Sequence, residues 1–353
     1  MKSVSQAIFA IILGLALQGC GEATGKRTEP APAPPVVGEV NVYSGRHYDS
    51  DLAIYDAFTR KTGIKVNLIE AGGDELIERL SREAEASPAD LFITADAGML
   101  WRAKARGVLR PIKNPEILAR VPAHFRDADN DWVGLSKRAR IIIYNKSKGA
   151  PEGLATYADL TKPEFRGKIC VRSSTNVYNQ SLLASMIGHV GDASAEKWAE
   201  GVVANFARKP EGVDTTQIED VAAGVCDISI VNTYYLARYL GSDDRKMRSI
   251  GEKVGFLFPN QQTTGTHVNV SGAGVARYAP NPENAEALIA YLLSDEAQQA
   301  FAAGNNEYPL VEGVAPVGPV ASFGAFRADD IDMTALGEHQ AEAVKIFDKA
   351  GWQ

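Results

Sequence analysis

Apolar and polar residues follow each other in two alternating periods from residue 39 onward. Short apolar runs, typical of buried strands, are each followed by a stretch with apolar residues three and four positions apart, which is typical of a helix packed on one face. The first strands are expected at residues 40–44, 64–70 and 90–94, each followed by a helix. Three strand–helix units in succession predict a parallel sheet covered by helices on both faces.

The alternation continues and predicts a second α/β region. A strand is expected at residues 136–144, followed by further strands and helices from Lys168 to about Pro259. A strand interrupted by glycines at residues 265–276 then returns to the first region, and residues 282–303 have the spacing of an amphipathic helix. The strands at 136–144 and 265–276 are therefore expected to cross between two lobes.

The length of the chain supports this division. At 353 residues it exceeds what one hydrophobic core usually supports, so two α/β lobes are expected. The expected N-terminal lobe comprises residues 39–137 plus 265–315, and the C-terminal lobe comprises residues 138–264 plus 316–353. The hydrophobic fraction of 45% and the charged fraction of 23% are ordinary for a soluble globular protein. A net charge of −7 without a clustered basic run argues against nucleic acid as a partner.

The N-terminus has the features of an export signal. Lys2 precedes an apolar run that is too short to span a membrane, and Cys20 follows that run. This arrangement resembles the lipobox of bacterial lipoproteins, although Gln18 replaces the usual small residue. We expect a signal peptide at residues 1–19, a lipidated Cys20 and a Pro- and Ala-rich tether at residues 20–38, which together give a membrane-anchored lipoprotein of the bacterial periplasm. The alternative is an ordinary secretory signal with an incidental cysteine.

Two further cysteines, Cys170 and Cys226, lie in or beside predicted strands at residues 168–172 and 225–230. Outside the cytosol leftover cysteines usually pair, so a structural disulfide between them is expected. A pair of buried thiols is the alternative. The spacing of the cysteines does not fit a metal site.

Three polar segments follow predicted strands, and each contains tyrosine. They cover residues 46–49, 173–180 and 232–235. Because ligands of such sheets bind beyond the carboxyl ends of the strands, we expect the three segments to share one rim of a cleft. Phenol oxygens are hard donors, and a hard cation such as Fe³⁺ prefers oxygen. A phenol, with a pKa near ~10, becomes a ligand at neutral pH only when such a Lewis acid displaces its proton.

The candidate ligands are four tyrosines and one histidine. They are Tyr48, Tyr178, Tyr234, Tyr235 and His47. Four phenolates around one Fe³⁺ leave one excess negative charge, which nearby arginines could offset. Arg238 follows Tyr234 by four positions on the same face of a predicted helix, and Arg46 and Arg140 are further candidates. Taken singly, these residues have simpler explanations: packing for the tyrosines, a surface loop for the histidine and a solvated charge for the arginine.

The segments at residues 46–51, 172–182 and 232–238 closely resemble the ferric-binding substrate-binding proteins of bacterial iron ABC transporters. The likeness is to their multi-tyrosine, anion-independent (FutA-like) class, and it extends from about residue 39 to the C-terminus. It implies an α/β periplasmic-binding-protein (type II) fold, in which two lobes joined by strand hinges close a central cleft on one Fe³⁺ ion.

The resemblance also implies roles for individual residues and partners. The implied metal ligands are His47, Tyr48, Tyr178, Tyr234 and Tyr235. The arginines that fall at charge-balancing positions are Arg46, Arg140 and Arg238. The expected function is to capture Fe³⁺ without any reaction and to deliver it, as a monomer, to an ABC permease and its ATPase.

Two other functions fit parts of the sequence. The same fold could bind an oxyanion or a polyamine for import, but such sites prefer backbone amides, hydroxyls, or aromatic walls with carboxylates. An exported enzyme is the second alternative. The chain has no Gly-x-Ser-x-Gly elbow, no HExxH pair and no glycine-rich phosphate loop, so we do not expect an enzyme.

Overall fold

The computed structural model describes residues 37–353. The predicted signal peptide, the lipidated Cys20 and almost all of the tether lie outside the described residues. The strands join in one sheet with the order β2-β1-β3-β9-β5-β7-β6, to which β4, β8 and β10 add at the sides. The strand bounds are β1 (Gly38–Ser44), β2 (Ile64–Glu70), β3 (Leu91–Thr94), β4 (Leu109–Arg110), β5 (Val133–Asn145), β6 (Ile169–Cys170), β7 (Ile228–Asn232), β8 (Val254–Leu257), β9 (Val268–Ala276) and β10 (Tyr308–Pro309).

The first three strands form the parallel sheet that the sequence predicts. β1 pairs in parallel with β2 on one side and with β3 on the other. β9 then adds antiparallel to β3, with Thr94 opposite Gly272, so the sheet as a whole is mixed. The direction of β9 follows from its origin, because it returns from the second group of strands rather than emerging from a strand–helix unit.

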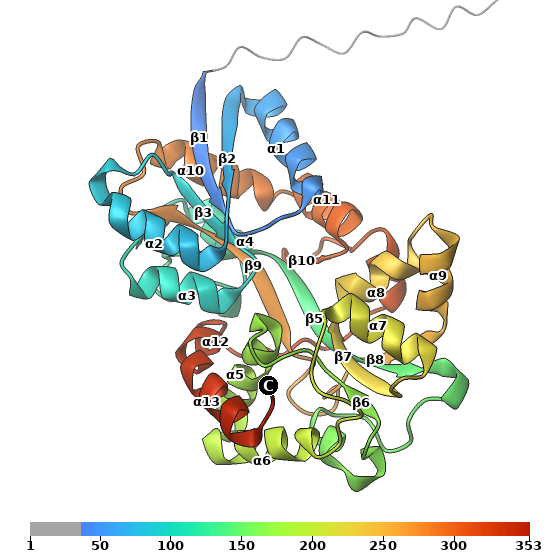
Figure 1. The fold of residues 1–353 in the computed structure, drawn as a ribbon. Coiled ribbons are helices and arrows are strands. Elements are labelled where there is room, and N and C mark those ends of the chain that lie inside the picture. The colour runs from blue at the N-terminus through green and yellow to red at the C-terminus, as the bar shows by residue number, and fades with distance from the viewer. Residues whose placement is uncertain (1–36) are drawn as a thin grey trace, which may run out of the picture. The chain divides into compact units, whose positions relative to one another are not determined.

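Two long strands connect the two groups of elements. β5 and β9 lie side by side and antiparallel, with Lys137 opposite Val270 (Figure 1). Further along, β5 pairs instead with β7, where Arg140 lies opposite Asn232. The crossing strands predicted at residues 136–144 and 265–276 are therefore present, although β5 begins three residues earlier, at Val133, and β9 begins three residues later, at Val268.

Helices cover both faces of the sheet. Those beside β1–β4 are α1 (Asp49–Thr62), α2 (Gly73–Glu83), α3 (Ala97–Ala105), α4 (Pro115–Arg120), α10 (Pro282–Leu292) and α11 (Asp295–Asn305). Those beside β5–β8 are α5 (Val177–Val190), α6 (Asp192–Val203), α7 (Asp214–Ala223), α8 (Thr233–Leu240), α9 (Arg245–Glu252) and α13 (Gln340–Ala350). The short α12 (Thr334–Glu338) packs against both α3 and α5.

The prediction of a single helix at residues 282–303 is wrong in one respect. The stretch is divided into α10 and α11, with a break at Leu293 and Ser294. Ser294 has an extended backbone, and its hydroxyl accepts a hydrogen bond from the Ala297 amide at 3.3 Å. A serine in this role caps a new helix rather than continuing the old one.

Hydrophobic side chains form three buried clusters. The first lies on β1, β3 and β9 under α1–α3 and α10. The other two lie on opposite faces of β5: Ile142 packs toward α5, α6 and α13, whereas Ile141 and Ile143 pack toward α7 and α8. Because successive side chains of a strand point to opposite faces, one apolar strand fills both layers.

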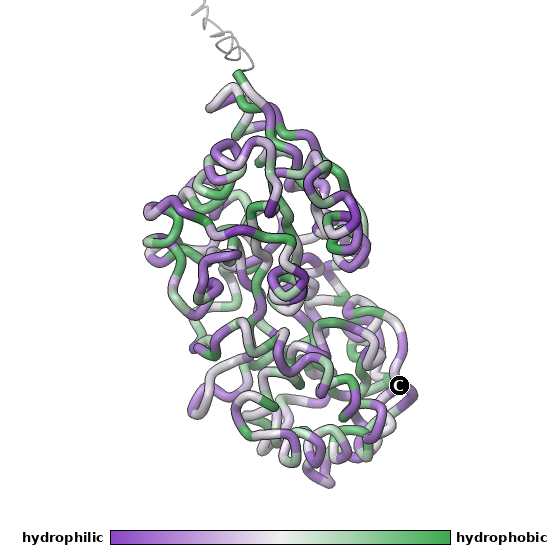
Figure 2. The backbone as a smooth tube through the Cα atoms, turned by 90° about the vertical axis from the view of Figure 1, so that its left-hand side faces the viewer, coloured by the Kyte–Doolittle hydropathy of each residue, from purple (hydrophilic) through white to green (hydrophobic). Residues whose placement is uncertain are grey.

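Hydrophobic stretches are short throughout. In Figure 2, apolar and polar segments interleave along the whole described chain. Between residues 37 and 353, no helix combines the length and hydrophobicity that crossing a bilayer requires.

Gly272 gives a test of this packing. A Cβ atom there would lie 2.5 Å from the Val133 carbonyl oxygen and 2.6 Å from Leu100 Cδ1. Because the carbonyl belongs to the neighbouring strand, it cannot move aside, and Gly272→Ala should lower the free energy of unfolding by about 3 kcal/mol. Thermal unfolding of the purified protein measures the change.

The matched control is Gly72→Ala. A Cβ at Gly72 would have no neighbour within 4 Å. The expected loss is about 1 kcal/mol or less, because only the residue that precedes α2 changes. Equal destabilisation by the two substitutions would contradict the close approach of β5 and β9.

Candidate functional site

Tyrosines from the three predicted segments meet in one place. The Tyr234 hydroxyl donates a hydrogen bond to the Tyr178 hydroxyl at 3.0 Å. The ring of Tyr48 meets that of Tyr234 edge-on, with 6.4 Å between ring centres, and the rings of Tyr234 and Tyr235 are 4.2 Å apart. We call these four residues the tyrosine cluster. Tyr178 and Tyr48, which lie 56 and 186 positions before Tyr234 in the sequence, thus share one site with it.

The cluster lies at the carboxyl ends of strands, where the sequence predicts it. β1 ends at Ser44, β6 at Cys170 and β7 at Asn232, and each strand leads into the segment that carries a cluster tyrosine. Parallel pairing of β6 with β7 brings two of these ends together. Ligands bind at this edge of open α/β sheets.

Each cluster tyrosine also lies at the start of a helix. Tyr48 is the residue that precedes α1, Tyr178 is the second residue of α5, and Tyr234 and Tyr235 lie in the first turn of α8. Asn176 fixes the start of α5, because its side chain accepts a hydrogen bond from the Tyr178 amide at 3.1 Å. Helix N-termini carry partial positive charge and stabilise nearby anions. Three helix starts thus favour the phenolate form at one site.

Burial has the opposite effect on the phenols. It raises the pKa of Tyr48, Tyr178 and Tyr234 above the usual value, and for Tyr178 and Tyr234 the neighbouring phenols raise the pKa further. The guanidinium of Arg138 acts against this and lowers the pKa of all three groups. In the metal-free protein these phenols are therefore protonated at neutral pH, and they ionise only if a cation displaces the protons.

Arginines surround Tyr178. The guanidinium carbons of Arg138, Arg140 and Arg172 lie 5.5, 5.8 and 5.4 Å from the centre of its ring. Arg140, which the sequence predicts, is held by Asp214 at 2.8 Å, and the same carboxylate accepts from Arg172 at 3.0 Å. Arg138 and Arg172 are not among the predicted site residues. The signal for Arg138 was its spacing of two from Arg140 on a strand, which places both side chains on one face.

The other two predicted arginines also lie against cluster tyrosines. The guanidinium carbon of Arg46 is 4.8 Å from the ring centre of Tyr48, and that of Arg238 is 5.8 Å from the ring centre of Tyr235. Arg46 is buried, whereas Arg238 is exposed. Solvent therefore screens the charge of Arg238 more than that of Arg46.

Several buried donors at the site have no partner among the described residues. They are Arg46 Nη1, Arg140 Nε, Arg172 Nε and the Asn232 side-chain nitrogen. A buried donor without a hydrogen-bond partner lowers the stability of the folded protein, because it has lost its hydrogen bonds to water.

His47 lies apart from these contacts. Its side chain is 58% exposed, and its Nδ1 is 4.0 Å from a carboxylate oxygen of Glu70. Within residues 37–353, none of the hydrogen bonds and ring contacts that join the cluster includes His47. Its role as a metal ligand stays a prediction.

The predicted disulfide is confirmed. Cys170 and Cys226 are bonded, and their Cα atoms are 5.9 Å apart. The bond joins β6 to the residues that precede β7, so it ties together two of the strands that lead to the cluster.

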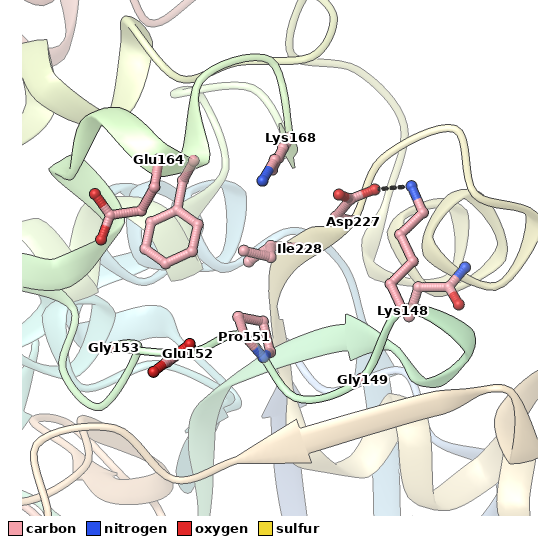
Figure 3. Close-up of a pocket in the computed structure, with 11 residues that line it drawn as sticks. Lys148, Gly149, Pro151, Glu152, Gly153, Glu164, Lys168, Asp227 and Ile228 are labelled. Atoms are coloured by element: carbon pink, nitrogen blue, oxygen red, sulfur yellow. Dashed lines mark hydrogen bonds and ion pairs between the residues drawn. The ribbon is translucent and has the colours of Figure 1, made fainter.

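A hollow of about 570 Å³ lies at the end of β7 opposite the cluster (Figure 3). Lys148, Lys168, Glu164 and Asp227 line it, and Asp227 pairs with Lys148. Lys148 and Asp227 point toward each other there, whereas Glu164 points away from them. Separately, no group of three or more His, Cys, Asp or Glu side chains with metal-binding geometry occurs in residues 37–353.

Comparison with known proteins agrees with the geometry. The profile of a family described as bacterial extracellular solute-binding protein matches residues 86–321. The chain is 45% identical to "Iron uptake protein A1" of Synechocystis, over 99% of this chain and 97% of that protein. It is 28% identical to the "Major ferric iron-binding protein" of Neisseria meningitidis, over 90% of this chain and 95% of that protein.

Solved structures are also similar. The structure described as Trichodesmium IdiA (FutA) in complex with iron and citrate is 51% identical and has a TM-score of 0.87, with 90% of this chain and 100% of that chain covered. The ferric binding protein of Campylobacter jejuni is 41% identical and has a TM-score of 0.83, with 89% and 100% covered. The chain thus has the type II periplasmic-binding-protein fold, and the FutA-like resemblance is confirmed.

The raised pKa values can be tested on metal-free protein. Tyr178 and Tyr234 should remain protonated near pH ~10, where free phenols ionise. The double substitution Tyr178→Phe/Tyr234→Phe should therefore leave the tyrosinate absorbance at that pH unchanged and reduce it only at higher pH. If the double substitution instead removed the absorbance of two tyrosinates near pH ~10, the raised pKa values of Tyr178 and Tyr234 would be contradicted.

Proposed function

Because the chain belongs to the family of bacterial extracellular solute-binding proteins, we propose that it captures Fe³⁺ and delivers it to an inner-membrane ABC permease for iron uptake. The observation that carries the proposal is the tyrosine cluster, in which tyrosines from three helix starts all contact Tyr234. Relatives whose names describe iron uptake or ferric binding support the same function.

The proposed ligands are the four cluster phenolates, with His47 as a fifth donor. They are Tyr48, Tyr178, Tyr234, Tyr235 and His47. For His47 to bind, its exposed ring must turn away from Glu70, which the weak 4.0 Å contact allows. Fe³⁺ suits this site because it is a hard cation and a Lewis acid strong enough to displace the phenol protons.

The proposed charge balance uses five arginines. Arg46, Arg140 and Arg238 are the predicted ones, and Arg138 and Arg172 join them because their guanidinium groups lie against Tyr178. Fe³⁺ with four phenolates carries one excess negative charge, which these side chains offset.

Iron is preferred to two other classes of solute. A polyamine would need carboxylates that converge on the cleft, whereas Asp214 is already bonded to two arginines. An oxyanion could accept hydrogen bonds from the arginines and from the protonated phenols, so the preference for iron over an oxyanion rests on the relatives, whose names describe iron uptake and ferric binding. Catalysis is not proposed either, because the relatives are solute-binding transport proteins.

Closure would bring the phenols fully together. We assign residues 39–137 plus 265–315 to one lobe and residues 138–264 plus 316–353 to the other, with β5 and β9 as the hinge. Tyr48 then belongs to the first lobe, and the other three cluster tyrosines belong to the second. Iron that bonds to both lobes would favour the closed state over the open one.

The protein is proposed to act as a monomer held at the membrane through a lipidated Cys20. The permease and its ATPase are the expected partners. This part rests on the sequence of the export signal and on the family.

Colour provides the direct test of function. Phenolate-to-Fe³⁺ charge transfer should colour the protein during titration with ferric citrate. Tyr235→Phe should remove most of this absorbance and weaken ferric affinity by more than ~100-fold, since loss of an outer-shell partner alone costs 10–100-fold.

Tyr157→Phe is the matched control. Tyr157 is also buried, but its hydroxyl donates to the Arg140 carbonyl and it lies outside the cluster. Its removal should leave colour and affinity unchanged. A wild-type protein that stays colourless with ferric citrate, or equal behaviour of the two variants, would refute the proposal.

Ferric affinity should also fall as pH falls. The pKa of Tyr48, Tyr178 and Tyr234 is raised by burial, so these phenols are protonated before binding and each releases a proton to the solvent when it binds iron. Affinity should therefore decrease roughly tenfold per pH unit for each such phenol. Competition with a chelator of known pH dependence measures this, and a flat profile between neutral and mildly acidic pH would contradict it.

A further inference from the structure

Glu307 is a fully buried carboxylate next to the tyrosine cluster. Its exposed fraction is 0%, and it lies immediately before β10. Its oxygens accept hydrogen bonds from Arg46 Nη2 at 3.1 Å, Ser136 Oγ at 2.8 Å and Ser271 Oγ at 3.2 Å. A buried carboxylate requires such partners.

These three hydrogen-bond partners of Glu307 lie in the two crossing strands and in the loop that carries Tyr48. Ser136 lies in β5 and Ser271 in β9, which are the two crossing strands. Arg46 lies two residues before Tyr48, in the loop that follows β1. Glu307 therefore fastens the Tyr48 loop to both crossing strands at once.

The position of Arg46 depends on this anchoring. Its guanidinium carbon lies 4.8 Å from the ring centre of Tyr48 and 5.1 Å from that of Phe301. Asp51 holds a second edge of the group, with Nε donating at 2.8 Å. Two carboxylates thus hold one guanidinium against the phenol.

The buried and half-buried charges around the cluster, from which the solvent-exposed Arg238 is left out because water screens it, leave a defined excess. Four arginines are buried or half-buried against cluster rings, and three buried carboxylates bond to them. The arginines are Arg46, Arg138, Arg140 and Arg172, and the carboxylates are Asp51, Asp214 and Glu307. Four positive and three negative charges leave one excess positive charge. Fe³⁺ with four phenolates has one excess negative charge, so the two match.

On the basis of the proposed function, we propose that Glu307 is a positioning and specificity-determining residue for ferric capture. It holds Arg46 against Tyr48, and it limits the excess positive charge around the cluster to the amount that a trivalent ion with four phenolates requires. A divalent ion in the same site would leave two negative charges against one positive charge. The surroundings therefore discriminate in favour of the trivalent ion.

Glu307→Gln tests the charge while keeping the size of the side chain. It leaves two excess positive charges around the cluster, which favours iron in the divalent state. The ratio of ferric to ferrous affinity should fall at least about tenfold, which raises the reduction potential of the bound iron by about 59 mV for a one-electron couple. Electrochemical titration of iron-loaded protein measures this shift, which a merely structural role of Glu307 would not produce.

Glu83→Gln is a closely matched control. The Glu83 carboxylate accepts from Arg79 Nε at 2.7 Å and from the Tyr43 hydroxyl at 2.9 Å, and Arg79 lies 4.7 Å from the ring centre of Tyr43. A carboxylate, a guanidinium and a phenol thus meet here as they do around Glu307, but outside the cluster. The variant should leave the potential of the bound iron unchanged.

Glu307→Asp separates charge from position, and it keeps the test valid if Glu307→Gln does not fold. The charge remains but the side chain is one methylene shorter, so it cannot keep all three hydrogen bonds. The affinity ratio should stay within about twofold of the wild type, whereas the charge-transfer band should shift because Arg46 and Tyr48 move.

The outcomes distinguish the inference from the proposed function. If the wild type takes up ferric iron but Glu307→Gln keeps the wild-type potential, or Glu307→Asp changes it as much as Glu307→Gln, the role of Glu307 is refuted and the function stands. If the wild type does not take up ferric iron, both are refuted.

Discussion

The proposed function requires four phenols to become anions inside a protein, and this is the constraint on which the rest of the site depends. Burial alone opposes ionisation, and each phenolate opposes the next. Two features of the fold favour the anionic form. Every cluster tyrosine lies at the start of a helix, and arginines lie against Tyr48, Tyr178 and Tyr235. Burial raises the pKa of Tyr48, Tyr178 and Tyr234, so these three phenols are protonated at neutral pH, and in the proposed function they ionise only when Fe³⁺ displaces their protons.

The rest of the fold serves to bring these groups together. Strands end at Ser44, Cys170 and Asn232, and the disulfide joins Cys170, the last residue of β6, to Cys226, which lies two residues before β7. β5 carries Arg138 and Arg140 toward the cluster and also pairs with β9 and β7. One strand therefore joins the two groups of elements and carries two of the arginines that lie against Tyr178.

Much of this could be predicted from the sequence. The three strand–helix units, both crossing strands and the convergence of the four tyrosines follow from apolar periodicity and from the rule that ligands bind at carboxyl ends. The disulfide was predicted from the position of its cysteines beside strands. In each case the signal is local, because it lies within one element or at its end.

The rest depends on long-range contacts that no local pattern encodes. Glu307 is distant from Arg46 in the sequence and looks like any surface glutamate, yet it is fully buried. Arg172 lay within a predicted segment, but only the fold shows that Asp214 holds it against Tyr178. The break between α10 and α11 was missed for another reason, since amphipathic spacing continues across Ser294 and only its capping contact interrupts the helix.

The most direct measurement is anomalous diffraction at the iron absorption edge from crystals of the iron-loaded protein. If the cluster binds iron, one dominant peak should lie within bonding distance of the phenol oxygens of Tyr48, Tyr178, Tyr234 and Tyr235. A dominant peak that none of these oxygens contacts, for example beside the exposed pair His47 and Glu70, would contradict it.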